Sequence, residues 1–216
     1  MGSDERQQYM DDLFGVESVD KQRIRENLIQ DNKWGINVGP NEGAMLRSLA
    51  ALGNVKTVVE IGTLYGYSAI WIAEALPEDG RIYCIEKSDE NFHRASELIA
   101  GSPQKSKITL IHSDALEALS DLASQGPFDM VFIDANKGGY FNYLKWAAEN
   151  VRSGGFILGD NTFLFGHVYG DGRSDMKMGP NPIAAMQKFN QFLAQSSEFV
   201  SCMIPTGEGM TLAVKR

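Results

Sequence analysis

The chain has 216 residues, of which 43% are hydrophobic and 22% charged. This balance is typical of a globular protein with a sizeable core and excludes a disordered chain. The formal net charge of −8 disfavours nonspecific binding to nucleic acid or to anionic membrane. No apolar run approaches the roughly 20 residues of a membrane span, so no membrane partner is expected.

The two cysteines and the polar N-terminus bear on the compartment. Cys84 and Cys202 both fall in predicted strands and are expected to be small buried hydrophobes rather than a disulfide or metal ligands. The first residues are polar and acidic and show no secretory signal. We therefore predict a cytoplasmic protein.

We predict a single domain over residues 1–216, with a helical extension over 1–35 and a core over 36–216. Within 4–33 the apolar spacing predicts two short amphipathic helices separated near Gly15. Asn41 is expected to cap the next helix, and Gly53 to end it. No repeat, low-complexity tract or linker interrupts the core.

From Thr57 onward, β-branched runs alternate with helical patterns. This alternation predicts right-handed βαβ units, a mostly parallel sheet and an α/β fold. The turn between the last two strands is short, so that pair is expected to be antiparallel. Expected strands span 57–61, 81–86, 107–112, 128–133, 156–159, 199–204 and 210–215, and expected helices span 89–100, 115–124, 140–151 and 182–195.

The stretch 57–68 reads as a strand, a glycine turn and the start of a helix. Its glycines are Gly62 and Gly66, and Leu64 stands where a dinucleotide fingerprint needs its middle glycine. Glu60 would repel a phosphate but suits a ligand with an ammonium group, such as the methionine part of S-adenosylmethionine. The alternative is a turn whose glycines serve packing only. Ser68 either receives a ligand carboxylate or caps the helix.

In open α/β sheets, ligands bind at the carboxyl ends of the strands. Glu86 lies 24 positions after Gly62, about where a ribose-binding carboxylate is expected. Asp114 and Ala115 would line an adenine edge, although Asp114 could equally cap the following helix.

A second group of strand-end residues points to metal chemistry. Asp134, Asp160 and Asn161 offer two carboxylates and an amide oxygen, a hard oxygen set suited to Mg²⁺ or Ca²⁺. Lys137 would project toward the same place and act as a general base. The alternatives are an ordinary turn at Asp160-Asn161 and a solvated lysine.

These blocks together resemble the cation-dependent O-methyltransferases of the caffeoyl-CoA and catechol type. The resemblance runs from about Ile36 to Arg216. It is carried by Val59-Glu60-Ile61-Gly62-Thr63, Gly66-Tyr67-Ser68, Phe132 to Tyr140, Gly159-Asp160-Asn161-Thr162 and Ile204 to Leu212.

The resemblance implies a Rossmann-like class I methyltransferase fold with a seven-stranded sheet whose last strand is antiparallel, helices on both faces, and usually a homodimer. It implies a divalent cation (Mg²⁺, or Ca²⁺ or Mn²⁺) on Asp134, Asp160 and Asn161, and Lys137 as the base. S-adenosylmethionine would be contacted at the turn and strand ends, by Val38, Glu60, Gly62, Thr63, Tyr65, Gly66, Ser68, Glu86, Asp114, Ala115 and Asp134.

The chain departs from the family pattern at Asn136, where an acidic residue or alanine is common, and in the loop 163–181, where we expect acceptor choice to reside. The predicted reaction is cation-dependent methyl transfer to a hydroxyl of a catechol-like molecule. The alternative keeps donor and metal but methylates a hydroxylated wobble uridine in tRNA, against which the acidic charge argues mildly. A nonenzymatic binder and an NAD oxidoreductase are disfavoured by the intact acidic set and the missing glycine, respectively.

Overall fold

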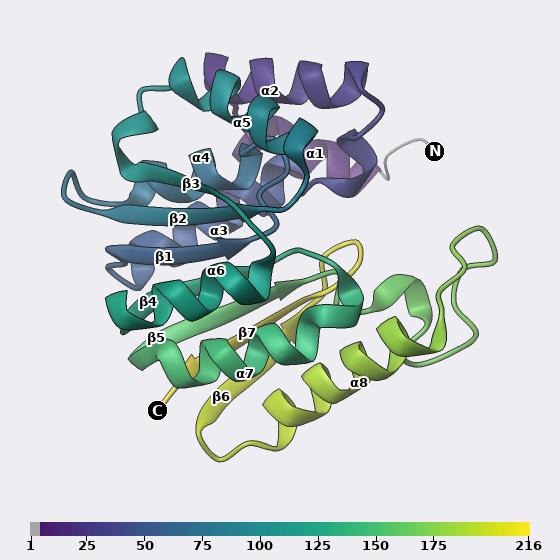
Figure 1. Cartoon of the computed structure of the whole chain (residues 1–216). Coiled ribbons are helices and arrows are strands. Elements are labelled where there is room, and N and C mark those ends of the chain that lie inside the picture. The colour runs from purple at the N-terminus through teal and green to yellow at the C-terminus, as the bar shows by residue number, and fades with distance from the viewer. Residues whose placement is uncertain (1–4) are drawn as a thin grey trace. The chain divides into compact units, whose positions relative to one another are not determined.

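The computed structural model describes residues 5–216, which form helices and strands close to the expected boundaries (Figure 1). The helices are α1 Glu5–Phe14, α2 Val19–Gln30, α3 Pro40–Leu52, α4 Tyr67–Ala75, α5 Asp89–Ala100, α6 Ala115–Leu122, α7 Tyr140–Asn150 and α8 Pro180–Gln195. The strands are β1 Thr57–Ile61, β2 Arg81–Glu86, β3 Ile108–His112, β4 Phe128–Ile133, β5 Val151–Asp160, β6 Phe199–Ile204 and β7 Met210–Lys215.

In this part of the chain the seven strands follow the order β3-β2-β1-β4-β5-β7-β6, with β7 antiparallel to both of its neighbours. The predicted fold class is therefore confirmed. None of the helices within 5–216 is both long and apolar enough to cross a membrane. The described residues group into two compact units, which we take in turn: the first contains 5–56 and 63–112, the second 57–62 and 113–216. The single domain stays a prediction.

The first unit is built on the parallel pair β2 and β3, which brings Glu86 beside His112. Helix α5 packs on both strands, and α4 packs on β2. Helix α3 lies against α4, α2 contacts α4 and α5, and α1 contacts α3. Every residue of α4 from Tyr67 to Ala73 is buried, because strands and helices together surround an almost wholly apolar sequence.

Lys21 joins α2 to α4 in the first unit. Its side chain is only 1% exposed, its Nζ lies 2.5 Å from Glu74 Oε1, and it stands 3.6 Å from the centroid of the Trp71 ring. Arg47 of α3 approaches the same partners, at 3.3 Å from Glu74 Oε2 and 5.0 Å from the Trp71 centroid, but is 41% exposed. A buried ammonium is tolerated here because a carboxylate and an aromatic face both offset its lost hydration.

The second unit contains the consecutive strands β1, β4, β5, β7 and β6. Parallel pairing aligns Ile61 with Ile133 and Ile133 with Gly159, and antiparallel pairing aligns Asp160 with Met210. The carboxyl ends of β1, β4 and β5 and the start of β7 therefore share one edge. Helix α7 packs on β4 and β5, and α8 lies beside α7 and contacts β6 (Figure 1).

Three sequence-based expectations were wrong. Helix α3 begins at Pro40, because Gly39 is its N-cap residue, the Glu42 side chain accepts the Gly39 N–H at 2.8 Å, and the fixed φ of proline suits the first helical position. Asn41 is therefore not the cap. Strand β5 begins at Val151, not 156, because Val151 pairs with Phe128 and a register shift absorbs the glycines that read as a turn. Cys84 is buried but Cys202 is exposed.

Replacing Lys21 with alanine is expected to lower the free energy of unfolding by about 2–4 kcal/mol, because Glu74 loses a buried partner and Trp71 loses its contact. Arg47→Ala serves as the matched control. It removes the more exposed contact to the same two residues and is expected to cost at most about 1 kcal/mol. Urea unfolding followed by circular dichroism measures both. Equal losses would contradict the difference drawn between the two cations.

Candidate active site

In the first unit, the turn after Gly62 is fixed by Glu86 at the end of β2. The Leu64 N–H donates to Glu86 Oε2 at 3.0 Å, and the Ser88 N–H donates to Oε1 at 2.7 Å. Thr63 N–H donates to the Ile85 carbonyl at 3.2 Å. Leu64 takes a left-handed φ of 52°, which the two hydrogen bonds around it hold in place. Each Glu86 oxygen keeps capacity for a further donor, as a ribose contact would require.

Gly66 and Ser68 open α4, but in different roles. Gly66 is the N-cap residue with a left-handed φ of 86°, which favours glycine, and a Cβ there would lie 2.6 Å from Ile99 Cδ1. Ser68 is the second residue of α4, is 5% exposed and is not the cap. The capping alternative for Ser68 is therefore wrong, and its contact with a ligand carboxylate stays a prediction.

Tyr65 and Val38 are both almost fully buried in the first unit. The Tyr65 hydroxyl donates to Asp31 Oδ2 at 2.8 Å, and its pKa is raised by burial and then by this hydrogen bond. Its side chain is thus engaged with the residue that follows α2. A contact of Tyr65 with S-adenosylmethionine stays a prediction.

In the second unit, Gly62 allows two backbone segments to meet. Gly62 has φ 90°, and a Cβ there would lie 2.2 Å from the Asp134 carbonyl oxygen. The Asp134 N–H donates to the Ile61 carbonyl at 3.0 Å, which continues the pairing of β1 with β4. Glu60, one strand residue earlier than Ile61, is fully buried. The glycine is therefore required by the approach of Asp134.

Asp114 caps α6, as the alternative interpretation held. Its Oδ1 accepts the Leu116 N–H at 3.0 Å, which satisfies one of the unpaired N–H groups of the first turn. Capping occupies one carboxylate oxygen and explains the residue without a ligand. A role of Asp114 and Ala115 at an adenine edge stays a prediction.

Asp134, Asp160 and Asn161 lie at one edge of the second unit. Asp134 and Asp160 directly follow Ile133 and Gly159, which are paired across β4 and β5. Asp160 is 4% exposed, and Asn161 is held at a left-handed φ of 54°. The described residues contain no group of three or more His, Cys, Asp or Glu placed to hold a metal ion. The predicted set has only two carboxylates; its third oxygen comes from an amide, and this chemistry fits a hard cation.

Lys137 points back toward these strand ends. Its Nζ lies 3.0 Å from Asp134 Oδ1, 2.7 Å from Tyr140 Oη and 3.4 Å from the Asp160 carbonyl oxygen. The Lys137 side chain is 16% exposed. Asn136 starts this short 3₁₀ turn by accepting the Gly138 N–H at 2.9 Å. Asn136 differs from the family pattern, but the Lys137 side chain still points toward the strand ends.

Sequence reasoning assigned no role to Tyr140. Its hydroxyl is buried and lies 3.0 Å from the Ile133 carbonyl oxygen and 2.7 Å from that of Asp160. Burial raises its pKa well above the usual range, and the charges of Asp134 and Asp160 raise it further. The sequence does contain a signal for the position of Tyr140. It lies three residues after the strand-end Lys137, and residues with this spacing share a face of one helical turn.

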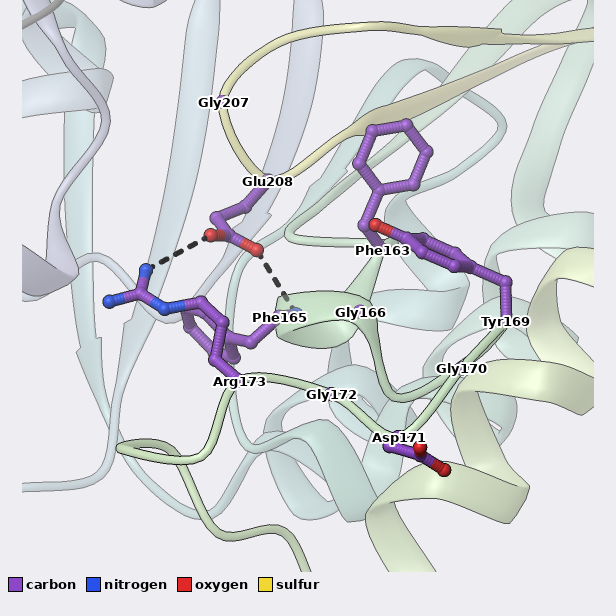
Figure 2. Close-up of a pocket in the computed structure, with 10 residues that line it drawn as sticks. All are labelled: Phe163, Phe165, Gly166, Tyr169, Gly170, Asp171, Gly172, Arg173, Gly207 and Glu208. Atoms are coloured by element: carbon purple, nitrogen blue, oxygen red, sulfur yellow. Dashed lines mark hydrogen bonds and ion pairs between the residues drawn. The ribbon is translucent and has the colours of Figure 1, made fainter.

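The loop after β5 forms a cavity of about 310 Å³ with the turn between β6 and β7 (Figure 2). Glu208 accepts the Phe165 N–H at 3.0 Å, and its other oxygen lies 3.6 Å from Arg173 Nη1. Leu164 and Phe165 both take left-handed φ values, near 50°. Strained backbone of this kind persists where surrounding contacts impose it and is frequent at functional sites.

Comparisons with known proteins define the family. Residues 16–216 match the family model described as O-methyltransferase. The chain is 31% identical to a catechol O-methyltransferase of Niastella koreensis, over 95% of this chain and 94% of that protein. It is 34% identical to a caffeoyl-CoA O-methyltransferase of Eucalyptus globulus, over 93% and 83%.

A solved structure agrees with these relatives. The O-methyltransferase TomG of Streptomyces achromogenes, determined in complex with S-adenosylmethionine, superimposes with a TM-score of 0.88 and 30% identity, over 100% of this chain and 99% of that one. The chain belongs to the O-methyltransferase family, so the resemblance stated from its motifs is confirmed, and it is an enzyme.

Gly62→Ala is expected to destabilise the second unit by about 3 kcal/mol, because it combines a left-handed φ with a clash against the Asp134 carbonyl. Gly35→Ala is the control, since a Cβ there would meet nothing within 4 Å. Thermal unfolding of both variants measures the difference. A Gly62→Ala protein as stable as Gly35→Ala would contradict the close approach.

Proposed function

We propose that this O-methyltransferase transfers the methyl group of S-adenosylmethionine to one hydroxyl of a catechol-like small molecule in a reaction that depends on a divalent cation. The observation that carries the proposal is the meeting of Asp134, Asp160 and Lys137 at the ends of β4 and β5. Two carboxylates, an amide oxygen and an adjacent lysine form a set of groups that suits both holding a hard cation and removing a hydroxyl proton.

The donor would be held by the residues that the family resemblance assigns. Glu86 would accept from the ribose hydroxyls with oxygens already oriented by Leu64 and Ser88. Glu60, Gly62, Thr63, Gly66 and Ser68 would surround the methionine part. S-adenosylmethionine supplies a sulfonium-activated methyl group and needs no covalent help from the protein, so positioning is the main contribution of these residues.

Asp134, Asp160 and Asn161 would hold Mg²⁺, Mn²⁺ or Ca²⁺, and such a cation lowers the pKa of a hydroxyl bound to it. Lys137 takes the proton of the acceptor hydroxyl. Tyr140 and Asp134 orient its Nζ, so the lysine is directed at the strand ends rather than at solvent. The deprotonated oxygen would then form a bond to the methyl carbon while the bond from that carbon to the sulfonium sulfur breaks, and S-adenosylhomocysteine would leave with the electron pair.

The test is methyl transfer from radiolabelled S-adenosylmethionine to catechol and to caffeic acid, with Mg²⁺ and then with excess EDTA. We expect turnover with Mg²⁺, loss of more than about 99% of it in EDTA, and recovery on adding Mg²⁺ back. Turnover unchanged by EDTA would contradict the cation site. Donor binding without turnover of any small molecule would contradict the catechol-like acceptor and direct the test to hypomodified tRNA.

Lys137→Met is expected to lower kcat by about 10²–10⁴-fold, the usual contribution of a positioned general base, while the Kd for S-adenosylmethionine stays the same. Lys145→Met in α7 is the control, because Lys145 is an exposed lysine of the same unit. Steady-state kinetics and calorimetric donor binding separate the two effects. Undiminished turnover in Lys137→Met would contradict the assignment of Lys137 as the general base.

We also propose a cytoplasmic homodimer. Helix α1 buries none of its residues and exposes Tyr9, Leu13 and Phe14, an apolar surface that a second copy would cover. Cys84 and Cys202 are both free thiols, in agreement with a reducing compartment. Sedimentation velocity at micromolar concentration is expected to give a dimer, and a Leu13→Glu, Phe14→Glu variant a monomer. A wild-type monomer would contradict the proposal.

A further inference from the structure

We propose that the cavity between the loop after β5 and the β6–β7 turn takes the substituent of the acceptor ring and selects it by charge, favouring neutral and cationic substituents over anionic ones. The inference rests on the proposed function and deepens it. The residues that line the cavity all belong to the second unit and come from the segment 163–173 and from Gly207 and Glu208.

The cavity lies beside the proposed cation ligands. Phe163 follows Asn161 by two residues, a span of roughly 7 Å of chain. The β6–β7 turn is tied to the same strand end, because Met210 pairs with Asp160, and the Thr162 and Phe163 N–H groups donate to the Gly209 and Glu208 carbonyls, both at 2.9 Å. An acceptor whose hydroxyls lie at the strand ends would therefore extend its ring substituent toward this cavity.

The size and the walls of the cavity suit part of a small molecule. Its volume of about 310 Å³ is at the lower end of the usual range for ligand pockets. Phe163 and Tyr169 form one wall, edge to face with their ring centroids 5.8 Å apart, and Glu208 and Arg173 form the other (Figure 2). Aromatic faces favour a ring or an alkylammonium group over a carboxylate.

The charge of the second wall decides the selectivity. Arg173 is the cation of the lining, and its guanidinium is already bound: Nη2 lies 2.8 Å and Nε 3.2 Å from the two Asp175 carboxylate oxygens, and Nη1 lies 3.6 Å from Glu208. Asp171 adds a third carboxylate, directed away from the Arg173–Glu208 pair (Figure 2). Of the residues that line the cavity, Arg173 carries one positive charge and Asp171 and Glu208 carry two negative charges, so the lining is net negative. Asp175, which lies outside the lining, adds a further negative charge beside Arg173.

An anionic substituent would have to displace Asp175 from a bidentate pair or lie next to Glu208 without compensation. Both cost affinity, because bidentate pairs are the stronger ones and like charges repel. An ammonium group would instead meet Glu208 and the two aromatic rings. The same reasoning disfavours a polyanionic thioester tail at this position.

The experiment compares three catechols of similar size that carry an ethylamine, an ethanol or an acetate substituent, with saturating S-adenosylmethionine and Mg²⁺. We expect kcat/KM for the amine to exceed that for the acetate by about tenfold or more, with the alcohol between them. Glu208→Gln keeps an oxygen for the Phe165 N–H but removes one negative charge. This variant is expected to lower the ratio of kcat/KM for the amine to kcat/KM for the acetate by about three- to tenfold.

The control is Glu198→Gln, the same chemical change at an exposed position at the other end of β6, roughly 20 Å of strand away. It is expected to leave the ratio unchanged. Equal use of amine and acetate by the wild type, a preference for acetate, or the same ratio change in both variants would overturn the inference alone. If none of the three catechols is methylated, the proposed function is contradicted, and the inference about the cavity is contradicted with it.

Discussion

The buried hydroxyl of Tyr140 is the contact on which the candidate active site depends. It lies within hydrogen-bonding distance of the carbonyl oxygens that end β4 and β5 and accepts from Lys137 Nζ. The single hydroxyl proton is shared between these two carbonyls, so one side chain contacts the ends of both strands and constrains the spacing of the residues beyond them. Asp134, Asp160 and Lys137 thereby take their positions from one side chain at the start of α7.

The backbone on either side of these strand ends is also constrained, by Gly62 after β1 and by left-handed residues after β5. Gly62 permits β1 to end against the Asp134 carbonyl, and Asn161, Leu164 and Phe165 turn the chain away from β5 immediately after Asp160. Such conformations cost on the order of 1–3 kcal/mol each and need surrounding contacts to hold them. Glu208 supplies one of those contacts by accepting the Phe165 N–H, so the loop that lines the cavity is tied to the β6–β7 turn.

Much of the fold follows from local sequence pattern, and the exceptions have physical causes. Strands 81–86 and 128–133 were predicted to the residue because short, mostly apolar runs there are bounded by turns or charged residues. The start of β5 was missed because Gly154-Gly155 reads as a turn, whereas the pairing of Val151 with Phe128 is a long-range contact. At the site, strand-end position pointed to Asp134, Asp160 and Lys137, which lie close together in the structure. Tyr140 was missed because its spacing of three residues from Lys137 is a weak signal, and its other two partners are backbone carbonyls, which leave no trace in the sequence.

The most direct test of the strand-end site is a titration with Mn²⁺, a hard cation visible by electron paramagnetic resonance, of the wild type, Asp160→Asn, Tyr140→Phe and the exposed control Glu117→Gln. We expect a single Mn²⁺ site in the wild type and in Glu117→Gln, loss of that site in Asp160→Asn, and weaker Mn²⁺ binding in Tyr140→Phe with the fold retained. Absence of Mn²⁺ binding in the wild type, or binding unchanged in Asp160→Asn, would contradict it.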